Sequence, residues 1–390
     1  MMMLLVSRRD DESGIPDRAA VAPVDKTAVM APGLLDGMRV LDVSIWRPMP
    51  HATQILCDLG AHVLKVEPPG GDPMRGFPEL FASVARGKRS VEIDLKSPNG
   101  ARRIQALVAE TDVFCEAWRP GVAARLGLAA EPLRAAHPSL IYCSISGYGQ
   151  DGPLRDMPGH DLNYQALGGA LRRAGESAER PQIPRLPVGD LEAGTLAALA
   201  VCAAWARRLA TGAGERIDIA MADVVAWWVG PRSGTVITHS AERAKGSPGY
   251  GIFRTADQQF ISLAPLTEPH LWAAICTALD LDDLAGVPYA DRLSATQEID
   301  ERLARVIGSL SLDEGLRRLT RAGAPASPLL TPEQAAAHPQ FRARHALTRA
   351  GSHDVAALPA ILTAHPRREA APVPEIGEHD GFPPRDPSST

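Results

Sequence analysis

Short apolar runs alternate with helical segments along the first half of the chain. The apolar runs have the length of buried strands and are bounded by Gly or polar residues; they span residues 38–43, 61–67, 112–118 and 139–146. The stretches between them repeat apolar residues at helical spacing, and they span residues 50–60, 97–112 and 131–138. Strands that alternate with helices in this way predict an α/β fold with a Rossmann-like, parallel, doubly wound sheet.

The pattern changes in the second half of the chain. A long Ala-rich helix is predicted to begin near Asp190 and to end at Gly212, and residues 216–219 form a further candidate strand. From about residue 231 the chain is rich in Gly, Ser and Pro, and a hairpin pattern and several amphipathic helical patterns follow. We therefore predict a disordered tail (1–33), a large α/β domain (34–230), a small α+β domain (231–330), and a stretch that returns to the large domain (331–390).

Composition and charge narrow the function classes. The 390 residues are 45% hydrophobic and 22% charged with a formal net charge of -5, and no Lys/Arg block is interleaved with aromatic residues, which argues against a nucleic-acid surface. No apolar segment reaches the ~20 residues needed to span a bilayer, and the short apolar N-terminal run precedes its charges, unlike a signal peptide. The five cysteines show neither a C-x-x-C pair nor a zinc-ligand spacing. We expect a soluble, cytoplasmic protein without a metal or a membrane partner.

A G-x-G-x-x-G pattern occurs at Gly147, Gly149 and Gly152. A dinucleotide-binding motif needs a helix to begin directly after these glycines, so that the helix N-terminus faces the pyrophosphate. Here Pro153 follows the last glycine directly, Pro158 comes five residues later, and no acidic residue ends a subsequent strand. The pattern therefore favours a loop over a nucleotide cradle.

Three polar residues are candidates for acid–base chemistry. His160 precedes a helical pattern, where the N-terminal dipole favours the neutral imidazole that accepts protons. Asp190 stands at the start of the Ala-rich helix, where ligands of open α/β sheets bind, and Glu268 begins a helix of the small domain. Each also has an ordinary interpretation: His160 as a polar loop residue next to Asp161 as the helix N-cap, and the two other carboxylates as caps.

The order of several segments resembles the family III CoA-transferases over roughly residues 34–380. The segments that carry the resemblance are DGMRVLDVS, ATQILCDLGAHVLKVEPPGGDPMR, GKRSVEIDLKSPNG, EAWRPGVAARLGL, LIYCSISGYGQDGP, PGHDLNYQALGG, VGDLEAG, AGAPASPLLTPEQAAAHPQ and EIGEHD. The resemblance implies a Rossmann-like large domain and a small α+β domain. It also implies a homodimer of interlocked subunits, threaded through each other near residues 220–235 and 330–340, and acyl-coenzyme A thioesters as substrates.

Two reactions share one site in this superfamily. In the transferases, an Asp at the position of Asp190 attacks the thioester and forms a mixed anhydride. In the α-methylacyl-CoA racemases the same Asp is one base of a pair, and the His of a GHD-[IL]-NY segment is the other. The segment GHDLNY makes His160 and Tyr164 resemble the racemase pattern, and Glu268-Pro269 resembles the racemase Glu that pairs with the His, with one residue inserted before it. Proton transfer between two bases needs no cofactor beyond the coenzyme A of the substrate.

The resemblance also implies residues that bind coenzyme A. Arg125 matches a phosphate contact, although a solvated helix arginine is the alternative. The residues implied to line the nucleotide or the substrate are Ile45, Trp46, Arg47, Ile93, Ala117, Trp118 and Tyr164. Pro68 departs from the family, where an Arg is frequent, so a phosphate contact is missing or comes from Arg47 or Lys88.

The sequence thus favours a racemase of 2-methylacyl-CoA thioesters that uses Asp190, His160 and Glu268. A CoA-transferase with Asp190 as nucleophile is the alternative, and the missing run of consecutive glycines in residues 246–259 weakens it. A nucleotide-binding oxidoreductase or a non-catalytic CoA-binding protein would not need the polar triad. The acyl group and the acceptor acid are not encoded in any of these motifs.

Overall fold

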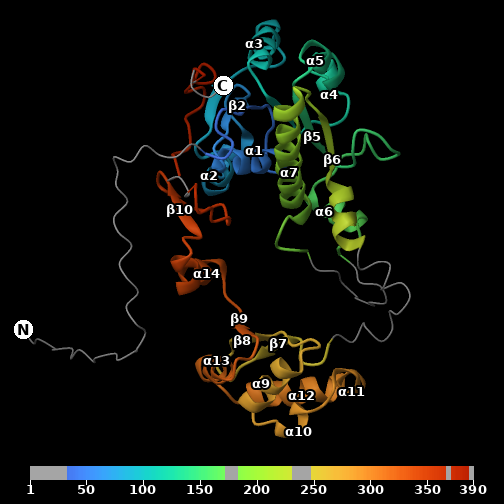
Figure 1. The fold of residues 1–390 in the computed structure, drawn as a ribbon, viewed down its shortest axis with the longest axis vertical. Coiled ribbons are helices and arrows are strands. Elements are labelled where there is room, and N and C mark those ends of the chain that lie inside the picture. Colours follow the sequence, from blue (N-terminus) through green and yellow to red (C-terminus); the bar gives the residue numbers. More distant parts are fainter. Residues whose placement is uncertain (1–32, 172–182, 231–246, 366–369, 386–390) are drawn as a thin grey trace, which may run out of the picture.

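A computed structural model of the chain describes residues 33–171, 183–230, 247–365 and 370–385. The predicted N-terminal tail lies outside the described residues. Figure 1 shows a large body that contains the first half of the chain, and a small body set apart from it. The described chain between β9 (Ala326–Pro328) and α14 (Pro332–Ala337) runs from the small body toward the large one (Figure 1).

The large body is built on a six-stranded parallel sheet. Its strands are β1 (Arg39–Asp42), β2 (His62–Glu67), β3 (Arg89–Glu92), β4 (Val113–Glu116), β5 (Ile141–Ser146) and β6 (Arg216–Ala220). The strand order is β3-β2-β1-β4-β5-β6, and every neighbouring pair is parallel. The predicted Rossmann-like α/β fold is therefore confirmed, and the strand order reverses between β1 and β4.

Helices cover both faces of this sheet. The helices on one face are α1 (Pro48–Asp58) and α7 (Val188–Thr211), and those on the other are α3 (Pro98–Ala109) and α5 (Ala130–Ala136). The two faces have separate apolar cores, which explains why the central strands are apolar on both sides. By length and composition α7 could cross a membrane, but it packs against α1, β5 and β6 as the core helix of this domain.

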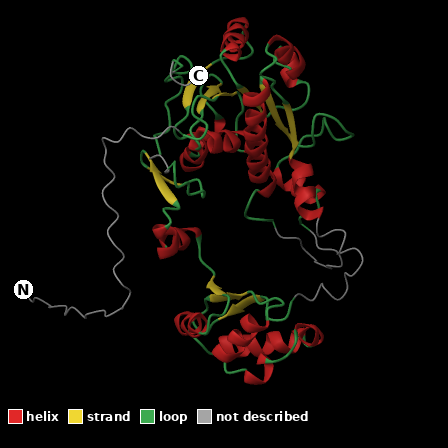
Figure 2. Ribbon diagram, viewed as in Figure 1, coloured by secondary structure: helices red, strands yellow, loops and turns green. Residues whose placement is uncertain are grey.

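The small body is an α+β unit with its own core. Its antiparallel sheet consists of β7 (Gly251–Arg254), β8 (Phe260–Leu263) and β9. Its helices are α9 (Pro269–Ala278), α10 (Asp282–Ala285), α11 (Tyr289–Ser294), α12 (Thr296–Ile307) and α13 (Leu312–Arg321), and they lie on one side of that sheet (Figure 2). Trp272 is fully buried at the centre, and its indole N–H donates to the Leu284 carbonyl at 2.6 Å.

The C-terminal stretch packs on the large body. After α14 come α15 (Pro339–Ala343) and the hairpin of β10 (Leu347–Ala350) and β11 (His353–Ala356). The chain then follows edge strand β3: the His379 N–H donates to the Ser90 carbonyl at 2.9 Å, and the Arg89 side chain donates to the Gly381 carbonyl at 2.8 Å. This stretch covers a sheet edge that would otherwise expose unpaired backbone groups.

Candidate active site

The first part of the site lies where the strand order reverses. The carboxyl ends of β1 and β4 diverge there, and ligands of open α/β sheets bind in the resulting crevice. Ile45, Trp46 and Arg47 follow β1, whereas Ala117 and Trp118 follow β4. Two residue groups predicted to line the nucleotide thus begin at adjacent strand ends, although they are about 70 positions apart in the sequence.

A buried ionic network fixes the loop after β1. The ammonium group of Lys65 lies 2.7 Å from Asp72 and donates to the Ser44 carbonyl at 2.9 Å, and both side chains are 1% exposed. Asp72 also accepts the Trp46 N–H at 3.5 Å. Trp46 has a φ of 64°, a left-handed backbone that costs energy for a bulky residue. Such strain persists only where the surroundings determine the conformation, and it gathers at functional sites.

Asp190 lies in the first turn of α7, with part of its side chain open to solvent. Burial and the nearby carboxylate of Asp161 raise the pKa of Asp190 to about 6, while Arg47 and His160 act in the opposite direction. The Asp190 carboxyl therefore titrates close to neutral pH. That property suits a group that takes and returns a proton during each turnover.

His160 is the N-cap residue of α6 (Asp161–Leu167), and the carboxylate of the next residue, Asp161, accepts the Asp190 N–H. The backbone N–H of His160 donates to the Asn163 side chain at 3.0 Å, and its imidazole is exposed. His160 and Asp190 are thirty positions apart, yet the imidazole is close enough to influence the ionisation of the carboxyl. That the two side chains converge on one substrate carbon stays a prediction.

Tyr164 is buried under this site rather than exposed to it. Its hydroxyl donates to the Gly159 carbonyl at 2.6 Å, its side chain is 4% exposed, and burial raises its pKa to about 12. The ring packs so closely on Gly147 that a Cβ there would lie 2.7 Å from it. Tyr164 thus fixes the loop that carries His160, and a direct contact with substrate stays a prediction.

Asp161 has a different role from the one expected. We predicted it as the N-cap of its own helix, but α6 begins at Asp161 itself and His160 takes the N-cap position. The carboxylate instead accepts the backbone N–H of Asp190 at 3.1 Å and the side-chain amide of Gln165. It therefore caps α7, ties the starts of α6 and α7 together, and raises the pKa of Asp190 through its charge. Sequence alone could not show this, because the capped helix begins 27 residues later.

Glu268 is not brought to the other two residues within one chain. It is the N-cap of α9 in the small body, whereas α6 and the start of α7 belong to the large one (Figure 1). Its carboxylate accepts the Leu266 N–H at 3.3 Å. Among the described residues no hydrogen bond or ion pair joins Glu268 to His160.

The predicted coenzyme A contacts differ in accessibility. Trp118 is partly exposed, and its N–H donates at 2.7 Å to Glu116, a buried carboxyl whose pKa burial raises to about 7. Arg125 ends the short helix α4 (Val122–Arg125) and is exposed, as a phosphate contact requires. Ile93 is 4% exposed in the core beside β3, so its contact with ligand stays a prediction.

The suggestion that Lys88 replaces a missing phosphate contact is wrong. Lys88 is 3% exposed, and its ammonium group lies 3.2 Å from Asp42 and donates to Thr53 at 2.7 Å. It neutralises a fully buried carboxylate under the sheet end and cannot reach a ligand. Sequence alone could not show this pair, because Asp42 and Lys88 are 46 residues apart and belong to different elements. Arg47 remains available for an anion.

The match to a family model identifies the family of this chain. The model for CoA-transferase family III matches residues 35–380, nearly the whole described chain. The chain belongs to CoA-transferase family III. It is an enzyme of this family, and an acyl-CoA substrate fits the family.

The relatives of this family III enzyme include both reaction types. It is 32% identical to the α-methylacyl-CoA racemase of Homo sapiens, over 88% of the chain and 91% of that protein. It is 30% identical to the acetyl-CoA:oxalate CoA-transferase of Acetobacter aceti, over 84% of the chain and 88% of that protein. A CAIB/BAIF family protein from Brucella suis has a similar structure, with a TM-score of 0.80 and 27% identity, covering 90% of this chain and 98% of that one. Overall identity therefore does not separate racemase from transferase.

The glycine pattern after β5 is a loop in this family III enzyme, which confirms the sequence interpretation. No helix begins between β5 and α6, a stretch that the structure describes completely. Gly149 and Gly152 have φ values of 88° and 84°, which the turns of the loop require. Gly147 makes room for Tyr164, so the glycines support the loop of His160 and cradle no pyrophosphate.

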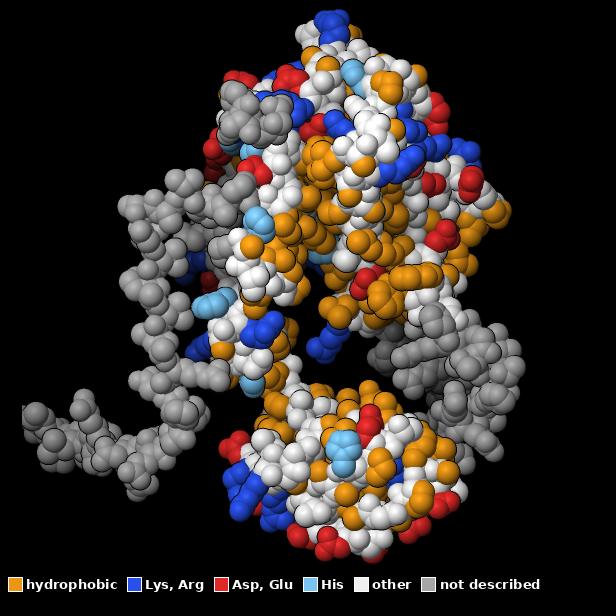
Figure 3. Space-filling view, viewed as in Figure 1, with side chains coloured by type: hydrophobic (Ala, Val, Ile, Leu, Met, Phe, Trp, Pro, Cys, Tyr) orange, Lys and Arg blue, Asp and Glu red, His pale blue; other side chains and the backbone are white. Residues whose placement is uncertain are grey.

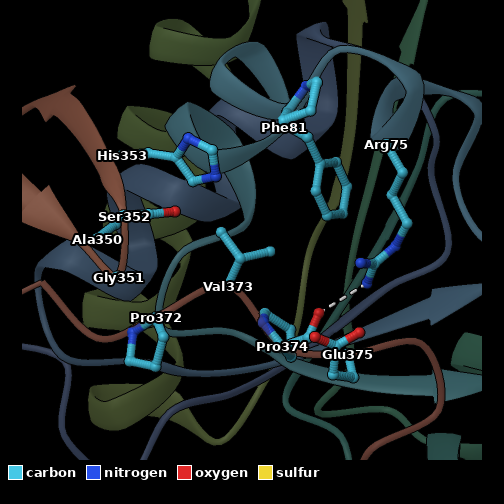
Figure 4. Close-up of a pocket in the computed structure, with 11 residues that line it drawn as sticks. Arg75, Phe81, Ala350, Gly351, Ser352, His353, Pro372, Val373, Pro374 and Glu375 are labelled. Carbon is cyan, nitrogen blue, oxygen red and sulfur yellow. Dashed lines mark hydrogen bonds between the residues drawn. The ribbon is translucent and has the colours of Figure 1, made fainter.

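One cavity elsewhere in the enzyme has polar walls, and its arginine is paired. Figure 4 shows this cavity of about 290 Å³ between α2 (Pro78–Ala85) and the hairpin β10–β11. Its Arg75 donates to both carboxylate oxygens of Glu67 and to the Pro374 carbonyl, and its guanidinium lies over Phe81. Through these contacts Arg75 holds the C-terminal stretch on the large body, so its role in this cavity is structural. Across the described ranges, no cluster of three or more His, Cys, Asp or Glu could hold a metal.

Proposed function

We propose that this family III enzyme inverts the α-carbon of 2-methylacyl-CoA thioesters by proton transfer between two bases. The proposal rests on one observation: the Asp190 N–H donates at 3.1 Å to Asp161, the residue after His160, so the starts of α7 and α6 lie together. The relative in Homo sapiens that is 32% identical is a racemase, which supports the same chemistry.

Inversion requires a proton to leave one face of the α-carbon and another to arrive on the opposite face. The thioester carbonyl makes the α-hydrogen acidic, because the negative charge moves to the carbonyl oxygen as an enolate. In one direction the Asp190 carboxylate takes the proton and the protonated His160 gives one back; in the other direction the roles exchange. A base works best when its pKa lies near the working pH, and the pKa of Asp190 is about 6.

The first turn of α7 also offers a donor for the enolate oxygen. The Gly189 N–H has no hydrogen-bond acceptor within the described residues, whereas the next N–H, that of Asp190, is bound by Asp161. Gly189 is buried next to the reacting carboxyl. A backbone N–H in that position, at the positive end of a helix, stabilises the negative charge that develops on the thioester oxygen.

The proposal includes a homodimer in which a second copy of the chain supplies Glu268. One chain holds Glu268 on the small body, away from His160, so pairing with that imidazole needs another copy (Figure 1). A single chain also exposes large apolar side chains along and below α7 (Figure 3): Leu199 is 64% exposed, Leu209 71%, Trp227 61% and Trp228 52%. An apolar surface of this kind is typical of a subunit interface. We further propose a cytoplasmic enzyme that needs no cofactor beyond the coenzyme A of its substrate.

Deuterium incorporation tests the proposed reaction. The enzyme is incubated in deuterated water with one epimer of a 2-methylacyl-CoA, and both α-deuteration and loss of stereochemistry are followed by NMR and chiral chromatography. We expect both in the wild type. With Asp190→Asn or His160→Gln, epimerisation should fall about 1000-fold or more, because one face loses its base. The remaining base in each variant should still exchange the α-proton of one epimer. The epimer that Asp190→Asn exchanges should be the opposite of the one that His160→Gln exchanges.

The alternative is a CoA-transferase in which Asp190 is a nucleophile. Transferase relatives of 30% identity, such as that of Acetobacter aceti, support this candidate. In it the Asp190 carboxylate attacks the thioester carbonyl, a bond to the acyl carbon forms, and the CoA thiolate leaves. Transfer of CoA to added carboxylic acids without α-deuteration would establish the transferase and refute the racemase. His160→Gln should then preserve most of the transfer.

A further inference from the structure

A buried carboxyl lies under the loop that follows β4. Glu116 is the last residue of that strand and is 3% exposed. Its carboxylate accepts the backbone N–H of Trp118 at 2.7 Å, two residues further along the chain. This hydrogen bond ties the loop of Ala117 and Trp118, which is predicted to line the nucleotide, to the end of the sheet. The buried carboxyl therefore fixes the backbone of a predicted ligand-binding loop.

Two separate contacts hold Trp118. Its side chain packs against the apolar core that α3 and α5 cover, and its backbone N–H is bound by Glu116. The rest of the side chain stays partly exposed. An indole ring held in this way offers a flat face on which a base such as adenine can stack. Because the ring moves with its backbone, a weaker hold on the N–H makes the loop less preorganised for a ligand.

Glu116 belongs to a row of polar side chains that crosses three strands. In the register of the sheet Glu116 pairs with Ser144 of β5, and Ser144 pairs with Asp218 of β6. Residues paired in this way face the same side of a parallel sheet, so the three side chains form one row. The Ser144 hydroxyl hydrogen-bonds to Glu116, whereas Asp218 accepts the N–H of Gln150, in the loop after β5, at 3.1 Å. Each carboxylate of the row thus holds a different loop.

The surroundings of Glu116 place its ionisation near neutral pH. Burial raises the pKa of Glu116 to about 7, its two hydrogen bonds lower it, and the charges of Asp218 and Arg216 act in opposite directions. Arg216 is itself paired with Glu131 at 2.6 Å, and Tyr142 of β5 stays neutral, because burial raises its pKa. An ionised carboxylate binds an N–H roughly twice as strongly as a neutral acceptor does, so the loop is held more firmly above about pH 7.

We propose that Glu116 is a positioning residue for coenzyme A: its carboxylate fixes the loop whose Trp118 side chain receives the nucleotide. This inference deepens the proposed function, because it concerns how the same site holds the coenzyme A part of the substrate. Glu116 is buried, so it acts through Trp118 and not by contact with the ligand. It therefore affects how tightly a thioester binds and leaves the proposed proton transfer to Asp190 and His160.

Binding of free coenzyme A to the full-length protein tests this inference. Glu116→Gln keeps the shape of the side chain and an acceptor for the Trp118 N–H, but it removes the charge. At about pH 8 we expect calorimetric titration to give about fivefold weaker binding to the variant than to the wild type. At about pH 6, where the wild-type carboxyl is mostly protonated, the two proteins should agree within about twofold. Titration of the coenzyme A phosphates cancels in this comparison, because both proteins meet the same ligand.

Asp218→Asn is the matched control in the same row. It removes a carboxylate that holds the loop after β5 and raises the pKa of Glu116. At about pH 8 this variant should bind coenzyme A within about twofold of the wild type, while the pH at which binding weakens should move lower.

Turnover gives a second readout. Glu116→Gln should raise the KM for a 2-methylacyl-CoA about fivefold at about pH 8 and leave the kcat of α-deuteration within about twofold. A change confined to KM is expected of a residue that positions coenzyme A. Circular dichroism and thermal unfolding establish that each variant is folded. Should Glu116→Gln fail to fold, Ser144→Ala takes its place: it removes a hydrogen bond that lowers the pKa of Glu116, so binding should weaken at a higher pH than in the wild type, and an unchanged midpoint overturns the inference.

The possible failures are distinguishable. If Glu116→Gln binds coenzyme A as tightly as the wild type at about pH 8, or is weakened equally at about pH 6 and pH 8, the charge does not position the loop and the inference is wrong. A variant with a lower kcat and an unchanged KM also overturns it, because Glu116 then acts on the reaction. If the binding effect follows Glu116 while no thioester is deuterated, the inference stands and the racemase proposal fails.

Discussion

Replacing Asp190 by Asn should stabilise the protein while it abolishes catalysis. The folded chain keeps the Asp190 carboxyl partly buried next to Asp161, which raises its pKa from 3.8 to about 6. An ionised carboxylate at this position therefore opposes folding. Asn has nearly the same shape and carries no charge. Among the described residues no hydrogen bond involves the Asp190 side chain, so the substitution breaks none.

The magnitude follows from the shift in pKa. A rise from 3.8 to about 6 is roughly two pKa units, and each unit corresponds to about 1.4 kcal/mol, which gives about 3 kcal/mol as an upper value. Because the side chain retains contact with solvent, we reduce this value to about 2 kcal/mol. For a domain of this size, about 2 kcal/mol raises the melting temperature by roughly 5 °C.

The pH dependence separates this effect from general changes in packing. A folded-state pKa above the unfolded value means that the penalty is absent below about pH 4, where both states bind the proton. The penalty grows between about pH 4 and 6 and is complete above it. We expect the melting temperatures of wild type and Asp190→Asn to agree near pH 4 and to diverge to the full difference by pH 8. Differential scanning calorimetry between pH 4 and pH 8 measures this difference in melting temperature.

Two results would refute the reasoning on Asp190. A stability difference that is the same at pH 4 and pH 8 would show that the Asn packs differently, independent of charge. A variant less stable than the wild type at pH 8 would show that the ionised carboxylate is favourable where it stands. Glu192→Gln, which removes a negative charge two residues further along α7, is the matched control and should not reproduce the pH-dependent gain.

Three further perturbations have defined outcomes. Asp161→Asn removes the charge that raises the pKa of Asp190, so the acidic limb of the pH–rate profile should move to lower pH; an unchanged or higher midpoint would contradict the coupling. Gly194→Ala should destabilise the enzyme by about 2 kcal/mol in urea unfolding, since its Cβ meets the backbone of α1; a neutral effect would mean that α1 and α7 separate easily. Lys88→Met should cost about 3–5 kcal/mol in the same assay at pH 7, because Asp42 stays charged and buried, and lowering the pH should reduce that loss as Asp42 is protonated.

The sequence predicted the central elements and their order, but it did not predict the strand at the edge of the sheet or the C-terminal hairpin. Strands such as β1 and β5 are buried on both faces, so they are continuous apolar runs that can be recognised directly. The edge strand β3 (RSVE) and the hairpin β10–β11 have no such run and were not predicted. The strand β3 is held by its pairing with β2 and by the C-terminal stretch, and the hairpin β10–β11 packs on α2. Local patterns cannot show an element that a distant segment stabilises.

For the site, the sequence determined the residue types and the ends of the elements that carry them. Motif order identified Asp190, His160 and the residues after β1 and β4, because the chemistry needs those residues at element ends. Only the tertiary structure decided which side chains are free to act. It buried Lys88 against Asp42, directed Asp161 to the start of α7, and left Arg47 without a side-chain hydrogen bond or ion pair within the described chain. The physical reason is that pairing, burial and pKa depend on neighbours in space, and these neighbours lie tens of residues away along the chain.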